Sequence, residues 1–351
     1  MRKALSQAAS CRRMIVIVLA VASIAGLSTA VSASADTGPD VGVLNKYVVP
    51  TTPKPNKPYR IILLQAHRSD AYAISYAWAV QTYGKQYGIK VTVQDAGGYQ
   101  NVQKQIAQIE AAVTQKPDAL LFWATDPTAV VPALKKADAA GIKVIGVVVP
   151  PALPVKFIVT GDFVLDGKTM ATALFKKMGS QGDAAIILGG AGSAYAAALK
   201  QGWTQALKSF PKVKVVADQT IPDFDPAKIQ SKVEDLLVRD PNLKGVMTAT
   251  TAMAAGAADA IAASGKSAYS VGEILGDCNQ ISLLKKGKLA IVLGVPAVYY
   301  GQVTVANTIR LLNGLSVAAK TVIPGNVYTP GNVAKAPLAL EIAPQFRKGC
   351  S

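Results

Sequence analysis

Short apolar runs alternate with longer amphipathic stretches along most of the chain. In the first half, each apolar run precedes a stretch of helical period, such as the one that contains Ile106, Ile109 and Val113. This alternation predicts a parallel sheet covered by helices on both faces. The expected strands are residues 60–65, 90–95, 119–123 and 143–149, and the expected helices are residues 73–87, 101–114 and 128–140.

The same alternation starts again after residue 156 and continues to residue 313. The chain is therefore predicted to form two α/β units of similar size and not a single long sheet. The expected strands of this second series are residues 157–160, 183–188, 214–219, 245–249, 269–272 and 290–294, and its expected helices are residues 166–178, 194–210, 226–238, 252–264 and 301–313.

The N-terminus has the three parts of a secretory signal peptide. A cationic stretch precedes the apolar residues 14–27, and the small-residue site Ala33-Ser34-Ala35 follows them. A membrane anchor is the alternative, but the apolar run is shorter than the roughly 20 residues that a span needs. Cys11 precedes the run, so it is not placed for lipidation. We expect a soluble protein that is exported to the periplasm and cleaved after Ala35.

Residues 36–57 separate this leader from the first strand. They are rich in proline and have little apolar periodicity, which predicts an extended linker. Regular structure is expected to begin at Tyr59.

Charge and residue counts exclude several classes of function. The 351-residue chain has a formal net charge of +16, but its lysines are spread singly and in pairs. Nucleic-acid binding needs cations gathered on one face, so no nucleic-acid partner is expected. His67 is the only histidine, and no metal-ligand spacing is present, so no metal or cofactor is expected. Cys278 and Cys350 can close a disulfide after export, a question that the cysteine count leaves open.

Several short motifs follow one another along the chain. They are residues 123–137 with Ala140-Gly141-Ile142, Gly161-Asp162, Gly190-Ala191-Gly192-Ser193-Ala194 with Gly202-Trp203, Pro222-Asp223-Phe224-Asp225-Pro226, Ala252-Met253-Ala254-Ala255-Gly256-Ala257 and Lys286-Gly287-Lys288-Leu289. In their order and spacing, residues 58–325 resemble the type I periplasmic sugar-binding proteins, the ribose-binding and galactose-binding kind.

This resemblance implies an α/β fold with two doubly wound parallel-sheet lobes, joined by a three-crossover hinge that closes on a ligand. It implies a first lobe of residues 58–160 plus 295–321 and a second lobe of residues 161–294 plus 322–351. Ligands bind outside the carboxyl ends of parallel strands, so the binding residues are expected just after the predicted strands.

Two positions in the loop after the first strand match the family pattern. Asp70 falls where the family bonds a sugar hydroxyl, and Tyr72 falls where it stacks an aromatic ring on the sugar, chemistry that suits a polyol. Phe224 falls where an aromatic closes the other side. Asp70 is also placed to cap the next helix, and Phe224 is also suited to a core position.

Other positions depart from the family pattern. Residues 148–149 are Val-Val where ribose binders have Asp-Arg, Ala197 replaces an arginine, residues 250–251 are Thr-Thr where Asn-Asp is usual, and Gly294 replaces an amide side chain. A hydrogen bond to a charged group contributes about 1.5–3 kcal/mol. Losing several of them argues against ribose, glucose and galactose as the ligand.

Aromatic and polar side chains elsewhere in the expected cleft are the candidate replacements. Such a pocket suits a sugar or polyol, and it also suits a small cation or zwitterion held by cation–π contact. The candidate ligand-binding residues are Asp70, Tyr72, Tyr99, Trp123, Tyr195, Phe224, Thr250, Thr251 and Glu273, with His67, Arg68 and Tyr299 as further candidates.

No catalytic arrangement is evident. His67 and Ser69 lie two residues apart on a loop, a spacing that is not expected to bring the hydroxyl to the imidazole. The glycines at residues 189, 190 and 192 suggest a dinucleotide fingerprint, but its last position is Ala194 and no P-loop lysine follows. We therefore expect a binding protein and not an enzyme.

Two functions fit these expectations. In the first, the protein captures a small polar ligand, a sugar, polyol or related solute, and delivers it to an ABC permease. In the second, it reports an amine or N-oxide ligand to a membrane sensor kinase. Both functions need a small-molecule ligand and a membrane partner, and both are compatible with the expected monomer. The sequence leaves the ligand's identity open.

Overall fold

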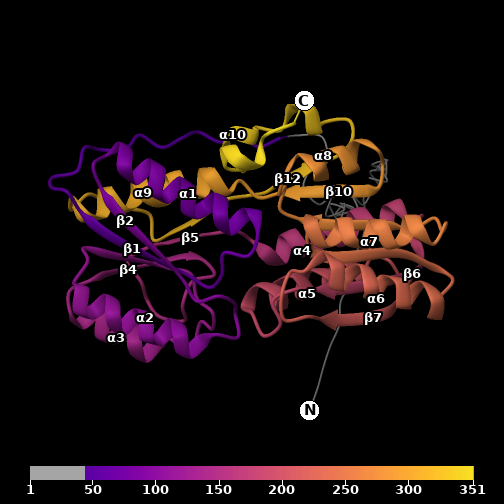
Figure 1. Cartoon of the computed structure of the whole chain (residues 1–351), viewed down its shortest axis with the longest axis horizontal. Helices are drawn as coiled ribbons and strands as arrows, with labels where there is room; N and C mark the ends of the chain where they lie inside the picture. Colours follow the sequence, from indigo (N-terminus) through magenta and orange to yellow (C-terminus); the bar gives the residue numbers. More distant parts are fainter. Residues whose placement is uncertain (1–43, 351) are drawn as a thin grey trace, which may run out of the picture. The chain divides into compact units, whose positions relative to one another are not determined.

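The computed structural model describes residues 44–350 (Figure 1). The predicted signal peptide and the first part of the predicted linker, residues 36–43, lie outside the described residues. The described strands are β1 (Arg60–Gln65), β2 (Lys90–Asp95), β3 (Ala119–Phe122), β4 (Lys143–Val148), β5 (Ile158–Thr160), β6 (Gln181–Leu188), β7 (Lys212–Thr220), β8 (Leu243–Thr250), β9 (Tyr269–Glu273), β10 (Leu289–Gly294), β11 (Lys320–Val322) and β12 (Asn326–Tyr328).

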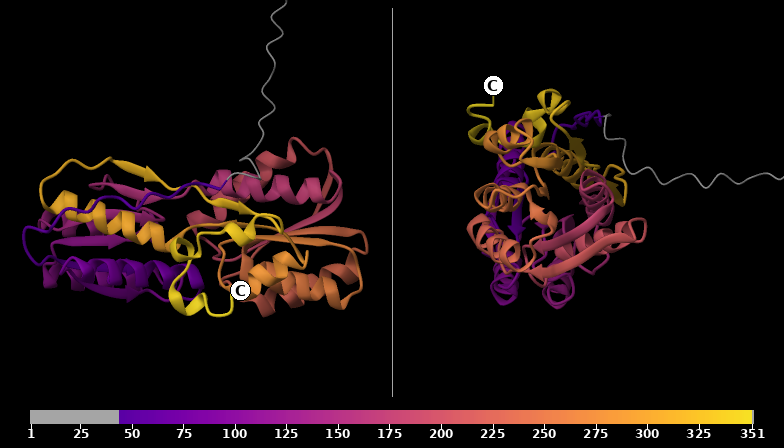
Figure 2. Two further views of the ribbon diagram at one scale, coloured as in Figure 1. Left: turned by 90° about the horizontal axis from the view of Figure 1, so that it is seen from above. Right: turned by 90° about the vertical axis from the view of Figure 1, so that its right-hand side faces the viewer.

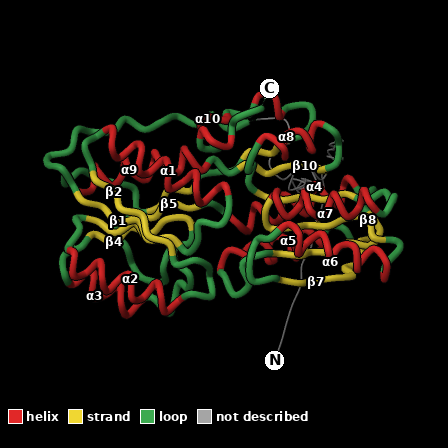
Figure 3. The backbone as a smooth tube through the Cα atoms, in the orientation of Figure 1, coloured by secondary structure: helices red, strands yellow, loops and turns green. Residues whose placement is uncertain are grey.

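Helices follow most of these strands, as the alternating pattern predicts (Figure 3). The described helices are α1 (Ala71–Gln86), α2 (Val102–Gln115), α3 (Val131–Ala139), α4 (Phe163–Lys177), α5 (Ala194–Leu207), α6 (Pro226–Arg239), α7 (Thr251–Ala263), α8 (Cys278–Lys285), α9 (Ala297–Leu312) and α10 (Leu338–Glu341), with short 3-10 turns at Val333–Lys335 and Pro344–Phe346.

The described strands form two six-stranded sheets. The first has the order β11-β5-β4-β3-β1-β2, and the second has the order β12-β10-β9-β8-β6-β7. Every neighbouring pair is parallel except β10 and β12. Central strands such as β3 and β10 are buried along their whole length, because helices cover both faces of a parallel sheet. The two-lobed α/β fold that the sequence predicts is confirmed.

Helices pack in pairs on each sheet. In the first lobe, α1 contacts α9 on one face of the sheet, and α2 contacts α3 on the other (Figure 1). In the second lobe, α4 pairs with α5, and α6 pairs with α7. Glycines allow the backbones of α4 and α5 to touch, since a Cβ at Gly202 would lie 2.1 Å from the Val164 carbonyl oxygen. This contact joins the N-terminal part of α4 to the middle of α5.

Three short connections join the two sheets. Residues 161–162 lead from β5 to α4, residues 295–296 lead from β10 to α9, and residues 323–325 lead from β11 to β12. The exact lobe boundaries stay a prediction.

Some helix limits differ from the sequence-based expectations. The helix expected at residues 128–140 begins only at Val131, because the Asp126 carboxylate accepts hydrogen bonds from the amides of Thr128 and Ala129 and forms a turn there. The helix expected from residue 301 begins at Ala297, directly after the connection. The three-residue strands β11 and β12 and the helices α8 and α10 were not predicted, since such short elements carry little periodicity.

The segment before β1, residues 44–58, is extended and lies along α9 (Figure 2). At its start, Asn45 hydrogen-bonds Asn326 of the second sheet. Further along, Val48 accepts a hydrogen bond from the Tyr299 hydroxyl of α9, and Lys54 accepts one from Asn313 at the end of α9. This segment therefore contacts both lobes.

The C-terminal segment, residues 337–350, also contacts both lobes. The Ala343 amide donates to the hydroxyl of Ser75 in α1, and the Tyr328 hydroxyl of β12 donates to Glu341 at 2.5 Å. Cys350 forms a disulfide with Cys278 at the start of α8, which answers the question that the cysteine count left open. The segment thus runs from the first lobe to a covalent attachment on the second.

No helix within residues 44–350 combines the length and apolar character that crossing a membrane would need.

Candidate ligand-binding site

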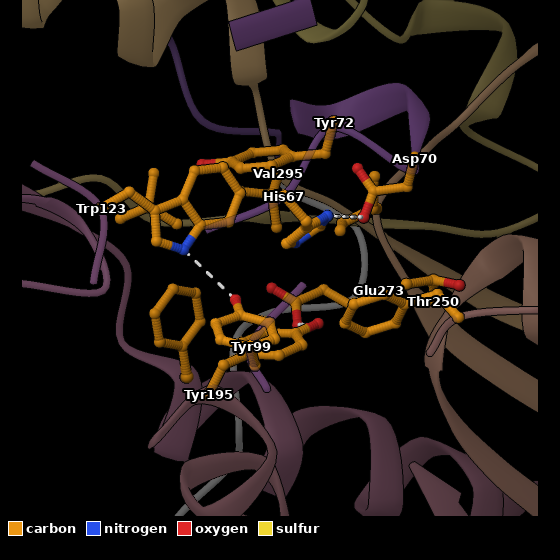
Figure 4. Close-up of a pocket in the computed structure, with 13 residues that line it drawn as sticks. His67, Asp70, Tyr72, Tyr99, Trp123, Tyr195, Thr250, Glu273 and Val295 are labelled. Atoms are coloured by element: carbon orange, nitrogen blue, oxygen red, sulfur yellow. Dashed lines mark hydrogen bonds and ion pairs between the residues drawn. The ribbon is translucent and has the colours of Figure 1, made fainter. Parts of the chain in front are cut away.

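A cavity lies at the carboxyl ends of the parallel strands, with walls from both lobes (Figure 4). The loop after β1 and the end of β3 supply part of the first wall, and the ends of β8 and β9 supply part of the second. The site is therefore where the strand-end rule expects it. The lining residues are His67, Asp70, Tyr72, Tyr99, Trp123, Val148, Phe163, Tyr195, Phe224, Thr250, Glu273, Ile274 and Val295.

All of the candidate binding residues except Thr251 line this cavity. Thr251 is fully buried, and its hydroxyl donates to the carbonyl oxygens of Glu273 and Ile274, so its placement in the pocket was wrong. Of the further candidates, His67 lines the cavity. Tyr299 instead stacks on Tyr47 beside the N-terminal segment, and Arg68 is exposed outside the lining.

His67 lies among aromatic rings from both lobes. Its ring centroid is 5.0 Å from that of Trp123 and 5.3 Å from that of Tyr99 in the first lobe, and 5.1 Å from that of Phe224 in the second. Burial lowers the pKa of His67, because a charged imidazole at this position would lose its hydration. The nearby carboxylates of Asp70 and Asp95 act in the opposite direction. The imidazole is a neutral part of the aromatic wall.

The expectation that Ser69 does not reach His67 was wrong. The Ser69 hydroxyl lies 3.1 Å from Nδ1 of His67, because the loop turns back before it enters α1. The Asp70 carboxylate lies 3.9 Å from the same nitrogen. A catalytic triad needs the nucleophile and the acid on opposite ring nitrogens, so this cluster lacks the geometry of a hydrolase.

Asp70 combines the two roles that the sequence left open. Its Oδ1 accepts a hydrogen bond of 2.8 Å from the Ala73 amide and so caps α1. Its Oδ2 faces His67 at the edge of the cavity (Figure 4). One carboxylate thus holds the first turn of α1 and presents a negative oxygen to the site.

Tyr99 and Trp123 form a connected pair in the first-lobe wall. The indole nitrogen of Trp123 donates to the Tyr99 hydroxyl at 3.2 Å (Figure 4). Burial raises the pKa of Tyr99, since the phenolate would lose its hydration. The pair is neutral and fixes both rings against the cavity.

Glu273 is the buried acid of the second-lobe wall. It lies at the end of β9 and accepts a 2.8 Å hydrogen bond from the Tyr195 hydroxyl of α5. It also hydrogen-bonds Asp166 in the first turn of α4. Two carboxyl groups can bond each other only when one carries a proton. Burial raises the pKa of Glu273 to about 8 and that of Asp166 well above its ordinary value.

The second-lobe wall depends on two glycines after β6. A Cβ at Gly189 would lie 2.4 Å from the carbonyl oxygen of Asp223, and one at Gly190 would lie 3.0 Å from the Phe224 ring. The loop therefore packs against Phe224 and does not form an open cradle for a dinucleotide phosphate.

Two β-branched residues of the lining have left-handed backbone conformations. Val148 has φ 57° at the end of β4, and Ile274 has φ 71° just after β9. This region is sterically costly for β-branched residues, and such strain gathers at functional sites. One strained residue therefore stands on each lobe at the cavity.

The free space inside the cavity is small. It offers about 20 Å³ to the centre of a water molecule, enough for about one water. A wider groove of about 270 Å³ adjoins it and shares Asp70, Phe224, Thr250 and Ile274 with it. A solute larger than water enters only if the lobes or the lining side chains move.

Sequence reasoning missed several lining residues. Phe163 lines the cavity, and Asp166 hydrogen-bonds Glu273. Both residues lie shortly after the Gly161-Asp162 motif, which was the sequence signal that could have identified them. Val148 was noted only as a departure from the sugar-binding pattern. Val295 and Ile274 carried no chemical indication. Within residues 44–350, no group of His, Cys, Asp and Glu side chains is arranged to hold a metal ion.

The fold consists of two α/β lobes joined by three short connections, with a cavity between the ends of their strands. The family model described as "Periplasmic binding protein domain" matches residues 61–316. The chain belongs to this family.

Known relatives and solved structures agree with this assignment. The chain is 26% identical over 273 residues to the ribose import binding protein RbsB of Bacillus subtilis, covering 78% of this chain and 88% of the relative. It is 26% identical over 293 residues to the periplasmic protein TorT of Escherichia coli, covering 83% and 84%. A periplasmic solute-binding protein of an ABC transporter from Actinobacillus succinogenes, solved with D-allose, has the same fold at a TM-score of 0.74 and 23% identity, covering 80% and 100%.

Proposed function

We propose that the protein is an exported solute-binding protein that captures a small polar ligand between its lobes and delivers it to an ABC importer. The observation that carries the proposal is the cavity whose walls come from both lobes. A ligand that touches both walls favours the closed arrangement, because it binds that state better than the open one. Import is supported by the ribose import binding protein among the relatives.

A binding role without catalysis is the simpler use of this site. The lining offers aromatic rings, hydroxyls and carboxyl groups. Its one imidazole contacts both Ser69 and Asp70 through the same nitrogen. We propose lobes of residues 58–160 plus 295–321 and residues 161–294 plus 322–351, and a monomer that exposes both lobes to its membrane partner.

The proposal is tested by a thermal-shift screen of sugars, polyols, amines and N-oxides. A ligand that binds only the native state stabilises it by RT ln(1 + [L]/Kd), about 2.7 kcal/mol at a hundredfold excess over Kd. Small-angle scattering with a hit at saturation is then expected to show a smaller radius of gyration. If no solute raises the melting temperature, or if hits leave the radius unchanged, ligand capture by closure is wrong.

A sensor function is the second candidate. It is supported by the similarity to the periplasmic protein TorT, which covers most of both chains. The two functions differ in the membrane partner. Permease and ATPase genes beside the gene for this chain, and loss of ligand uptake when the permease gene is deleted, support import. A neighbouring histidine kinase gene whose output follows the ligand supports sensing.

A further inference from the structure

We propose that the ligand is a small organic cation of the methylated ammonium type, enclosed by the aromatic rings of the cavity and bound at the carboxyl pair Asp166–Glu273. This inference rests on the proposed function, because it names the class of solute that the clamp captures. The inferred ligand differs from the sugars named for several relatives. The inference rests on the residues that line the cavity.

The charges of the lining favour a cation. Asp70 lines the first-lobe wall and Glu273 the second, and no lysine or arginine is among the described residues that line the cavity. Arg68, on the loop beside Asp70, is exposed outside it. A ligand with a positive charge offsets the cost of burying acidic groups, which a neutral ligand leaves uncompensated.

Aromatic rings surround the same space. His67, Trp123 and Tyr72 belong to the first lobe, and Tyr195 and Phe224 belong to the second. Neighbouring ring centroids lie 5.0–6.4 Å apart, so the rings form a continuous wall. A cation within about 6 Å of a ring centroid is attracted by the ring quadrupole. Methyl groups on the nitrogen also pack against these faces without needing hydrogen-bond partners.

The carboxyl pair supplies the counter-charge. In the absence of ligand, burial keeps Glu273 and Asp166 protonated at neutral pH. The charged groups around the pair are Asp70 and Asp162, and both oppose its ionisation. The other titratable groups around it are neutral tyrosines, namely Tyr47, Tyr72, Tyr99, Tyr195 and Tyr300. A cation beside Glu273 favours the ionised carboxylate, so binding of the cation expels a proton from the pair to solvent. Capture of the cation is thereby linked to pH.

An unused polar atom offers a second point of contact. Tyr72 lines the cavity and is 3% exposed, and its hydroxyl has no hydrogen-bond partner among the described residues. A buried hydroxyl without a partner is costly, and an oxygen on the ligand would satisfy it. The ligand is thus expected to carry an oxygen function near its cationic nitrogen.

Calorimetric titration with matched probes tests the charge requirement. Choline and 3,3-dimethylbutan-1-ol have nearly the same shape, but only choline is charged. We expect choline to bind at least about tenfold more tightly, as one effective charge contact would give. Equal binding of the neutral alcohol overturns the proposal. So does failure of choline, tetramethylammonium, glycine betaine and carnitine all to bind.

D-Allose and D-ribose separate this proposal from the proposed function. If a sugar binds and compacts the protein while the ammonium probes do not, the cation inference fails and solute capture stands. If neither the sugars nor the ammonium probes shift the melting temperature, the cation inference fails. The proposed function fails as well only if no polyol, amine or N-oxide of the wider screen shifts it.

The pH dependence tests the role of the carboxyl pair. When binding expels one proton, affinity rises about tenfold per pH unit from pH 6 to pH 8, and the heat of binding depends on the ionisation enthalpy of the buffer. Glu273→Gln is expected to weaken choline binding at least about tenfold at pH 8 and to abolish both effects. An unchanged pH profile in Glu273→Gln overturns the assignment.

Glu341→Gln is the matched control. Glu341 is also a fully buried acid, with its pKa raised to about 7 by burial, but it lies in the C-terminal segment and does not line the cavity. This variant is expected to bind choline within about twofold of the natural protein and to keep its pH profile. Melting temperatures of both variants without ligand show that they fold.

Discussion

At the scale of single residues, several side chains at the cavity have a structural and a ligand-facing role together. Asp70 caps α1 with one carboxylate oxygen and faces the site with the other. Tyr195 of α5 bonds both the Ala249 carbonyl and Glu273. Variants that remove such a side chain change folding and binding together, so the informative substitution keeps the structural contact and alters only the ligand-facing group.

Asp70→Asn is such a substitution. Asparagine caps helices about as well as aspartate, so the free energy of unfolding is expected to change by less than about 0.5 kcal/mol. Ligand affinity is expected to fall, because the negative oxygen at the cavity edge is lost. Asp225→Asn is the control, since Asp225 caps α6 in the same way but does not line the cavity. Equal effects of both variants on affinity, measured by calorimetric titration, would contradict the assigned role.

Glu273 predicts a pH dependence of stability without ligand. Its pKa rises from 4.5 to about 8 on folding, so the folded state holds a proton that the unfolded chain releases. This contribution is complete below about pH 4.5 and is lost as the pH rises through about 8, at up to roughly 1.4 kcal/mol per pH unit. Urea unfolding between pH 5 and pH 8 should give a shallower fall for Glu273→Gln than for the natural protein. Parallel curves would refute the raised pKa of Glu273.

At the scale of elements, the crossing of α4 and α5 connects packing to the site. The two helices touch through glycine, and their first turns carry Asp166 and Tyr195, the two partners of Glu273. The geometry of the acid pair therefore depends on how closely these helices approach.

Gly202→Ala tests this dependence. A Cβ there would meet the Val164 carbonyl oxygen at 2.1 Å and the Lys168 amide at 2.4 Å, so the helices must separate. Overpacking of this kind typically costs about 1–3 kcal/mol, and ligand affinity should fall with it. Gln201→Ala, at an exposed neighbouring position, should change stability by less than about 0.5 kcal/mol. Chemical denaturation distinguishes the two, and a neutral Gly202→Ala would mean that the helix contact is loose.

Elements with strong periodicity were predictable, and the cavity chemistry was predictable only in part. Strand β1 matches its expected limits because an apolar run between polar residues defines it. Thr251 was misplaced because sequence gives a position after a strand but not which way its side chain points. The pairing of Asp166 with Glu273 joins residues far apart in sequence, and only the close packing of α4 on the second lobe brings them together.

At the scale of the whole described chain, both terminal segments contact both lobes. The N-terminal segment bonds Asn326 of the second sheet and Asn313 of α9, and the C-terminal segment joins Ser75 to Cys278. These contacts add to the three connections and restrict how far the lobes can separate.

Removing the disulfide tests how much the C-terminal attachment contributes to the free energy of unfolding. Cys278 and Cys350 lie 72 residues apart, and a cross-link over such a loop typically contributes about 2–5 kcal/mol. The double variant Cys278→Ser/Cys350→Ser should lose stability by that amount in urea unfolding. Reductant should lower the midpoint of the natural protein and leave the double variant unchanged. A midpoint that reductant does not move in either protein would argue against the bond.

The left-handed backbone at Val148 and Ile274 has an evolutionary consequence. Each of these residues costs of order 1–3 kcal/mol relative to a relaxed conformation, yet their side chains line the cavity. Glycine would relieve the strain at either position but would remove part of the wall. Selection for heat resistance alone would therefore be expected to replace these two residues first and to weaken solute recognition. At these positions, solute recognition is maintained at the expense of stability.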